Sequence, residues 1–361
     1  MKIALVGGIY CKSDEFRRKL QVTPETILER GFRERGHEVA TYGHYKCVNS
    51  TRFDIVHVHH LSYGAARMAL DSGSAAFAYT SHDPFAMVGQ LNVFRRRAAR
   101  FVMSRADAVV ALSVLESDFQ ERSYPLSGAA HPVIPNGVYE GSYHYGRKNN
   151  RARNGPWHLL YVGQLAAQKN VDVLLRALAQ LTQRVELSLI YHNSTLEDSL
   201  RTLVSELGLQ GRAQFLGARS PQELAAEYQN ADLFVLPSSA EALPSVITEA
   251  MLCGTPVVAT DVGGVREQLA GYGVCVGPGD PAALASAISC VLDNYDRFVA
   301  QGEAASVYAS ERFSVDHMVD HHLELYTDLL ARRGPRRRHS AMRVPIDAIL
   351  RTGVSVICAT K

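Results

Sequence analysis

Short runs of apolar, often β-branched residues alternate with longer amphipathic stretches along the whole chain. This alternation is typical of parallel strands joined by crossover helices, because helices cover both faces of such a sheet and its strands are apolar throughout. In the first half, the pattern predicts helices over Pro24–Arg35 and Leu91–Arg105. It predicts strands at Ile3–Val6, Val39–Tyr42, Asp54–His59, Ala76–Thr80, Ala108–Leu112 and Val133–Ile134. The chain is therefore expected to be an α/β protein.

The alternation stops between Tyr139 and Trp157, where polar and turn-forming residues crowd together, and then restarts. Helices are expected from Pro221 and Pro281, since Ser220 and Asp280 can cap the first free N–H groups and proline suits the first helical position. The last amphipathic segment is Val315–Leu330. Strands are predicted at His158–Val162, Glu186–Tyr191, Gln214–Leu216, Leu233–Leu236, Val257–Thr260 and Gly273–Val276.

Two similar halves suggest two facing Rossmann-like domains with a cleft between them. Ligands of open parallel sheets bind beyond the carboxyl ends of the strands, so we expect the loops of both halves to point into that cleft. The predicted division is residues 1–145, residues 155–315, a helix over 316–333 that braces both halves, and a basic tail over 334–361.

The composition limits the class of protein but does not indicate a binding partner. With 361 residues, 47% of them hydrophobic, the chain has room for two domains at about 150 residues each. The net charge of +2 gives no sign of nucleic-acid binding. No signal peptide and no apolar run of about 18 residues is present, so we expect a cytoplasmic protein. The six cysteines are scattered, which favours free thiols over disulfides.

A basic segment follows the last predicted helix. It spans Arg332–Arg343 and is rich in arginine, and no acidic residue appears before Asp347. Such a run is usually a solvated tail, which is the favoured interpretation here. The alternative is a patch for anionic lipid, which would place the protein at a membrane surface.

The most informative stretch runs from Pro237 to Glu267. A strand leads into a loop, a helix begins near Pro244 or Ser245, and Gly254 ends that helix before the next strand. Glu241 lies on the loop and Glu249 lies inside the helix. Between them, the free N–H groups of the helix start carry partial positive charge. This arrangement suits a diphosphate flanked by hydroxylated rings.

The segment closely resembles the E-x7-E signature of the retaining family 4 glycosyltransferases, which have the GT-B fold. The resemblance spans nearly the whole chain and is strongest from Leu160 to Glu267, where Pro256-Val257-Val258-Ala259 and Gly263-Gly264 also match. It implies that Glu241 contacts the transferred sugar and that Glu249 binds the ribose. It also implies that the backbone around the helix start holds sugar and diphosphate, through Ala242, Leu243, Pro244, Ser245 and Val246.

A second match is the run from Tyr161 to Asn170, which is similar to the G-R-L-x-x-x-K-G turn of the family. The resemblance implies that Lys169 contacts the diphosphate, where an ammonium stabilises the charge that grows on the leaving group. Gln164 stands where the family commonly has arginine. It can donate a hydrogen bond to the diphosphate but supplies no charge.

The amino-terminal half carries weaker matches. His82 follows a predicted strand where the family has a histidine that faces the donor sugar, and a histidine satisfied within a loop is about equally compatible. Asp83 is a candidate for acceptor binding, or for capping the helix beyond Pro84. Gly7 and Gly8 follow the first strand, as in the family's glycine turn near the donor diphosphate or the acceptor.

Two other patterns are discounted. His57 and His59 share one face of a strand, as metal ligands would, but no third ligand accompanies them with clear spacing. Gly7-Gly8 lacks the G-x-G-x-x-G pattern of dinucleotide sites. The resemblance implies that the enzyme needs no metal and no cofactor.

The expected function is a metal-independent retaining hexosyltransferase with Glu241, His82 and Lys169 as its catalytic residues. It would move a sugar from a nucleoside diphosphate, UDP by default, to a hydroxyl of a small-molecule, oligosaccharide or lipid-linked acceptor. The alternatives are a nucleotide-sugar epimerase or phosphorylase of the same fold, or a silent nucleotide-binding partner subunit. The sequence leaves open the base, the sugar, the acceptor, the linkage and the oligomeric state.

Overall fold

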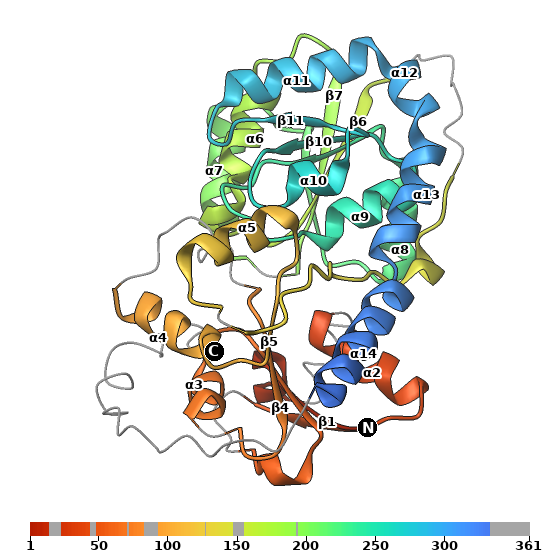
Figure 1. Ribbon diagram of the computed structural model, residues 1–361. Coiled ribbons are helices and arrows are strands. Elements are labelled where there is room, and N and C mark those ends of the chain that lie inside the picture. The colour runs from red at the N-terminus through yellow and green to blue at the C-terminus, as the bar shows by residue number, and fades with distance from the viewer. Residues whose placement is uncertain are drawn as a thin grey trace. The chain divides into compact units, whose positions relative to one another are not determined.

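The structure is a computed structural model (Figure 1), and it describes residues 1–13, 23–43, 48–70, 72–82, 93–126, 128–146, 155–192 and 194–332. The chain divides into two compact units. The first comprises residues 1–137 together with 315–361, and the second comprises residues 138–314. Each unit is built on a parallel sheet of its own.

The sheet of the first unit has the strand order β2-β1-β3-β4-β5, with every pairing parallel. Strands β1, β3, β4 and β5 are almost entirely buried, which explains their continuous apolar sequences. Their carboxyl ends meet at one edge, because parallel strands all run the same way. The strands are β1 (Lys2–Val6), β2 (Glu38–Tyr42), β3 (Ile55–His59), β4 (Ala76–Thr80) and β5 (Ala108–Val110).

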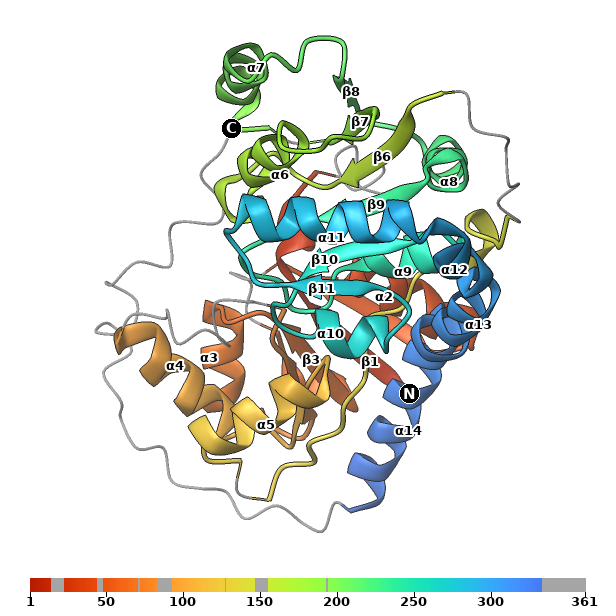
Figure 2. The same cartoon turned by 90° about the horizontal axis from the view of Figure 1, so that it is seen from above.

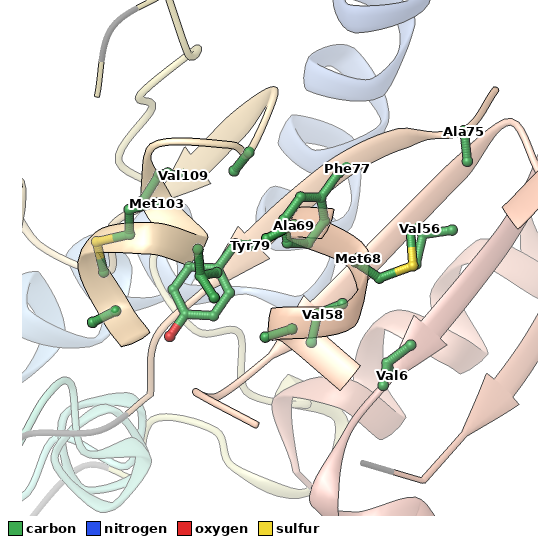
Figure 3. Close-up of a cluster of buried hydrophobic side chains, with 14 of the residues drawn as sticks. Val6, Val56, Val58, Met68, Ala69, Ala75, Phe77, Tyr79, Met103 and Val109 are labelled. Carbon is green, nitrogen blue, oxygen red and sulfur yellow. The ribbon is translucent and has the colours of Figure 1, made fainter. Parts of the chain in front are cut away.

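Helices pack against this sheet and close a core between them (Figure 3). Side chains from β1, β3 and β4 meet side chains of α3 and α4 in that core, including Val6, Val58, Met68, Phe77 and Met103. The helices described in this unit are α2 (Pro24–Glu34), α3 (Tyr63–Leu70), α4 (Val93–Met103), α5 (Val114–Ser123) and α14 (Val315–Ala331).

The start of α2 shows why the chain folds locally as its sequence predicts. The side chain of Thr23 accepts a hydrogen bond from the backbone N–H of Thr26, and the Thr26 hydroxyl in turn accepts one from the backbone N–H of Thr23. Pro24 occupies the first helical position, where its missing N–H costs nothing. This cap fixes the position of Glu25, the next residue of the helix.

Helix α14 returns to the first unit from the far end of the chain. It packs against α2, and Figures 1 and 2 both show the two helices side by side. A β-carbon at Gly31 would lie 2.4 Å from a methyl carbon of Val319, so glycine permits this close approach. Arg35 adds ion pairs of 2.7 Å to Asp316 and to Asp320. The predicted bracing of both halves by this helix stays a prediction.

The sheet of the second unit has the order β11-β10-β9-β6-β7-β8 and is also parallel throughout. Strands β6 and β9, the neighbours at its centre, lead into the two loops that the sequence singled out. The strands are β6 (Trp157–Val162), β7 (Val185–Ile190), β8 (Ala213–Gly217), β9 (Leu233–Leu236), β10 (Val257–Thr260) and β11 (Val274–Val276).

Two helices of the second unit, α8 and α11, begin where their capping residues predict. Ser220 and Glu223 form a reciprocal capping box at α8, and Asp280 accepts hydrogen bonds from the backbone N–H groups of Ala282 and Ala283 at α11. The helices are α6 (Val171–Leu178), α7 (Glu197–Glu206), α8 (Pro221–Asn230), α9 (Ser245–Leu252), α10 (Val265–Leu269), α11 (Pro281–Asp293), α12 (Tyr295–Ala300) and α13 (Gly302–Phe313).

One predicted strand is wrong. Val133–Ile134 forms only an isolated bridge between Ala111 and Val133, because Pro132 and Pro135 on either side have no N–H to continue a ladder. Within the described ranges, no helix is both long and apolar enough to cross a membrane.

Candidate functional site

In the second unit, the loop between β9 and α9 carries Glu241, whose side chain is buried rather than solvated. The residue is only 8% exposed. Its Oε1 accepts a hydrogen bond of 2.7 Å from the hydroxyl of Ser238, which is fully buried. The same oxygen lies 2.5 Å from the Nζ of Lys169, whose side chain is 17% exposed. The structure thus brings together two predicted site residues that lie 72 positions apart in sequence.

The turn after β6 positions Lys169. The Tyr161 hydroxyl donates to the backbone oxygen of Gln164 at 2.7 Å and fixes the start of the turn. At its other end, the backbone N–H of Ser239 donates to the oxygen of Gln168 at 2.8 Å. Asn170 then adopts a left-handed conformation, with φ of 48°, at the start of α6. The turn is therefore anchored directly on the loop that carries Glu241.

Two glycines hold that loop from the other side. Gly263 has φ of +54°, and a β-carbon there would lie 1.8 Å from the backbone oxygen of Glu241. The backbone N–H of Gly264 donates to the oxygen of Ala242 at 2.9 Å. Only glycine at position 263 allows the backbone after β10 to approach so closely, so Gly263 has a structural reason.

Helix α9 begins at Ser245, as the sequence predicts, with Pro244 at its N-cap. No side chain caps this end, so the amides of Ser245 and Val246 sit where an anion would gain from the helix dipole. Leu243 is buried beneath the loop, and the Pro244 oxygen accepts a hydrogen bond of 3.0 Å from the side chain of Gln268. Gln164, by contrast, has an exposed side chain.

Glu249 lies one turn inside α9. Its Oε2 accepts a hydrogen bond of 2.9 Å from the hydroxyl of Tyr228 in α8. Burial raises the pKa of its carboxyl to about 7, and the hydrogen bond from Tyr228 opposes that rise. A carboxyl that titrates near neutral pH can accept hydrogen bonds from hydroxyl groups when it is ionised.

In the first unit, the carboxyl ends of β3 and β4 gather histidines. His57 Nε2 lies 2.7 Å from the hydroxyl of Thr80, and His57 Nδ1 lies 2.6 Å from the hydroxyl of Tyr326 in α14. His59 Nδ1 lies 3.0 Å from Nε2 of His82. The rings of His57 and His59 lie on one face of β3 with centroids 4.2 Å apart and planes tilted by 33°, as alternate residues of one strand can.

A buried acid completes this cluster. Glu25 in α2 is 3% exposed, and its Oε1 lies 3.4 Å from Nε2 of His60, whose ring is 5.0 Å from that of His82. Burial acts to raise the pKa of Glu25, but the hydrogen bond with His60 and the nearby histidines lower it well below its usual range. A β-carbon on Gly7 would lie 3.2 Å from this carboxylate, so the glycine turn sits against it.

We define the histidine cluster as His57, His59, His60 and His82 with Glu25. No group of three or more candidate metal ligands is arranged to hold an ion among the residues that the structure describes. Asp83 lies outside the described residues, and so does the basic tail beyond Arg332. Their predicted contacts with acceptor and lipid stay predictions.

Sequence reasoning missed several polar residues of both regions. Glu25 was overlooked because an acid in the first turn of a helix ordinarily faces solvent. Ser238 and Thr80 stand at the carboxyl ends of strands, a position that could have marked them. His59 was set aside with the metal pattern, and nothing in the sequence links Tyr228 to Glu249.

The chain is similar to known glycosyltransferases in both halves. Residues 40–141 match the model described as Glycosyltransferase Family 4, and residues 146–307 match the model described as Glycosyl transferases group 1. A D-inositol 3-phosphate glycosyltransferase from Corynebacterium urealyticum is 30% identical over 319 residues, which cover 80% of this chain and 75% of the relative. The same enzyme from Rhodococcus opacus is 30% identical, with 76% and 67% covered.

Solved structures share the fold. Sucrose-phosphate synthase from Thermosynechococcus elongatus superposes with a TM-score of 0.78 at 19% identity, covering 92% of this chain and all (100%) of that one. HepE from Anabaena, in complex with UDP, has a TM-score of 0.73 at 21% identity, with 91% and 100% covered. The expected α/β architecture of two Rossmann-like domains is confirmed. The chain belongs to the family 4 glycosyltransferases of the GT-B fold.

Proposed function

We propose that the protein is a retaining hexosyltransferase that uses a nucleoside diphosphate sugar, with UDP as the first base to test. The observation that carries this proposal is the pairing of Lys169 with Glu241 beside the uncapped start of α9. An ammonium and free helix amides together suit a diphosphate, and the adjacent carboxylate suits the hydroxyls of a sugar.

In this proposal, residues of the second unit hold the donor in position and stabilise the negative charge that develops on the diphosphate. The bond between the anomeric carbon and the phosphate oxygen breaks, and the acceptor oxygen bonds to the same face of that carbon. The acceptor proton passes to the departing phosphate oxygen. Lys169 and the amides of Ser245 and Val246 stabilise the growing negative charge, with Gln164 as a further donor. Glu241 orients the sugar, and ionised Glu249 accepts hydrogen bonds from the ribose.

In the first unit, we propose that His82 faces the donor sugar and that Gly7 and Gly8 lie near the diphosphate or the acceptor. The acceptor offers a hydroxyl. The curated relatives named above are called D-inositol 3-phosphate glycosyltransferases, so inositol phosphate belongs in an acceptor panel beside neutral sugars and lipid-linked sugars. HepE was solved with UDP and with UDP-glucose, which supports trying UDP-glucose first as donor.

The test is turnover of a nucleotide-sugar panel with and without acceptors. We expect product with the configuration of the donor retained, and Glu241→Ala should lose at least about 100-fold in turnover because it removes a group that orients the sugar. Glu303→Ala, an exposed acid of α13 in the same unit, is the matched control and should keep full activity.

Three outcomes would contradict the proposal. Epimerised nucleotide sugar formed without acceptor would indicate an epimerase, and sugar release that requires inorganic phosphate would indicate a phosphorylase. Donor binding without turnover for any acceptor would indicate a silent partner subunit.

A further inference from the structure

The hydrogen bond between His59 and His82 joins two neutral rings. Burial lowers the pKa of His59 well below its ordinary value and lowers the pKa of His82 to about 3. Both rings are therefore uncharged near neutral pH, with one proton each. Glu25 nearby raises the pKa of both, but less than burial lowers it.

One proton sits between the two rings, and it constrains both of them. If His82 Nε2 donates, His59 Nδ1 must be bare, so His59 carries its own proton on Nε2. If His59 Nδ1 donates instead, His82 Nε2 must be bare, and His82 carries its proton on Nδ1. The 3.0 Å contact thus requires the two rings to share one tautomer, either both protonated on Nε2 or both on Nδ1.

The outer nitrogens of this pair have no partner in the part of the chain that the structure describes. His59 Nε2 and His82 Nδ1 are both inaccessible to solvent and form no hydrogen bond with any residue that the structure describes. In either tautomer, one of these atoms is a donor and the other an acceptor. An unpaired buried polar atom costs about 1–3 kcal/mol, so a ligand hydroxyl that reaches one of them gains that hydrogen bond.

No other group that the structure describes fixes the tautomer. His57 lies against His59, with its ring tilted by 33°, but is bonded to Thr80 and Tyr326, and His322 donates its Nδ1 proton to the backbone oxygen of Met318. The other ionisable neighbours in the described part of the chain are His60 and Glu25, which pair with each other. Each of these groups has its own partner, and the choice of tautomer is left to the pair and to its ligand.

We propose that His59 is a positioning residue for His82, and that the two rings act as one tautomer-coupled unit that reads a hydroxyl of the substrate. This inference rests on the proposed function for the identity of that substrate. A sugar hydroxyl that donates to His82 Nδ1 would select the state protonated on both Nε2 atoms. A hydroxyl that accepts there would select the opposite state.

The experiment is nitrogen NMR of the whole protein labelled with ¹⁵N in histidine, which reports the protonation of each ring nitrogen. We expect His59 and His82 to show the same tautomer, and a UDP-sugar to shift both together. In His59→Phe, the tautomer populations of His82 should change, and the KM for the donor should rise about tenfold, equivalent to about 1.4 kcal/mol, with a smaller change in kcat.

His59→Asn is the conservative variant, because its amide lies near the former Nδ1 and can still bond His82. It should recover most of the donor KM, and it also serves if His59→Phe does not fold. His131→Asn is the control for loss of a histidine elsewhere in the first unit, since His131 bonds only backbone oxygens in the described structure. It should leave the signals of His82 unchanged.

Opposite tautomers in the free protein, or an unchanged His82 spectrum in both His59 variants, would overturn the coupling. A spectrum of the pair that no UDP-sugar alters, in an enzyme that turns that sugar over, would overturn the reading of a substrate hydroxyl. The tautomers are measured without substrate, so failure of the proposed glycosyl transfer is seen separately, in the activity panel.

Discussion

In the first unit, histidines gather around one buried carboxylate, whereas in the second unit a lysine ammonium is paired directly with a glutamate. In the histidine cluster, one nitrogen each of His59 and His82 has no partner among the described residues. In the second unit, Lys169 and Ser238 both donate to the same oxygen of Glu241. The first region therefore offers a ligand buried nitrogens that have no partner in the described structure, whereas in the second region the Oε1 of Glu241 already has two donors.

This difference has a consequence for binding. A ligand at the histidine cluster adds hydrogen bonds to atoms that have none, and it breaks nothing in the described structure. A phosphate at Lys169 would accept from another N–H of the ammonium that already donates to Glu241, so one positive charge would serve two anions. We therefore expect the second unit to suffer more from loss of a single side chain, because the partner left behind is a buried charge.

The largest expected effect is that of Lys169→Ala. Turnover should fall by about 10²–10³, because the departing diphosphate loses its cationic partner. Stability should fall by about 1–3 kcal/mol without unfolding, since buried Glu241 keeps only Ser238. Kinetics and urea denaturation measure the two effects. Lys2→Ala removes an exposed lysine paired with Glu38 and should change neither quantity appreciably.

Gly263→Ala comes next. The new β-carbon would collide with the backbone oxygen of Glu241, and the positive φ adds strain. We expect a loss of about 2–4 kcal/mol in unfolding free energy, by analogy with other strained substitutions, and a clear fall in turnover. The control is Gly279→Ala. Gly279 also has a positive φ, of +79°, but a β-carbon there would meet no atom within 4 Å. It should cost about 1–2 kcal/mol and leave turnover intact; equal effects would mean that the close approach is unimportant.

Tyr326→Phe tests the first unit. It leaves the buried Nδ1 of His57 without its 2.6 Å partner, so unfolding free energy should fall by about 1–3 kcal/mol. Tyr308→Phe in the second unit removes a hydroxyl that makes a weak contact of 3.5 Å to the oxygen of Glu267, and it should cost less. Thermal denaturation of both variants measures the difference. A Tyr326→Phe variant as stable as the wild type would contradict the expectation.

The smallest effect is the pH dependence due to Glu249. Burial raises its pKa to about 7 in the folded protein from 4.5, so the folded state holds this proton more tightly. The stability it contributes is fully present below about pH 4.5 and is lost as the pH rises through 7. In thermal denaturation from pH 4 to 8, the melting temperature of Glu249→Gln should decline less with rising pH than that of the wild type.

Glu116 in the first unit provides the matched control. Burial likewise raises its pKa to about 7, against hydrogen bonds from Leu112 and Gln120. Glu116→Gln should therefore alter the pH dependence of stability in the same direction. Only Glu249→Gln should also weaken donor binding, measured by calorimetry with UDP. Equal donor affinity in both variants would argue against the ribose role of Glu249.

The order of strands and helices was largely predictable from sequence, because parallel sheets covered on both faces impose long apolar runs. The caps at Thr23, Ser220 and Asp280 were equally predictable, since each depends on only a few neighbouring residues. The strand predicted at Val133–Ile134 was wrong. The prediction rested on two apolar residues, and the prolines on either side have no N–H group to extend the hydrogen bonding to a neighbouring strand.

The candidate sites were less predictable. Glu241 and Lys169 were found through a motif, but their ion pair depends on two turns that meet only in the folded unit. The burial of Glu25 depends on how α2 meets the residues that follow β1 and β3, which the sequence of α2 alone does not show. The shared proton of His59 and His82 depends on a distance of 3.0 Å between neighbouring strand ends.

The return of α14 to the first unit has a consequence for how the protein is made. His57 and Tyr326 are separated by 269 positions, and the entire second unit lies between them. Because domains generally fold as they emerge from the ribosome, the second unit can be completed while the first still waits for its last helix. A chain released from the ribosome that ends at residue 314 should therefore carry a complete second unit and an unfinished amino-terminal unit, and limited proteolysis should cleave the amino-terminal unit more easily.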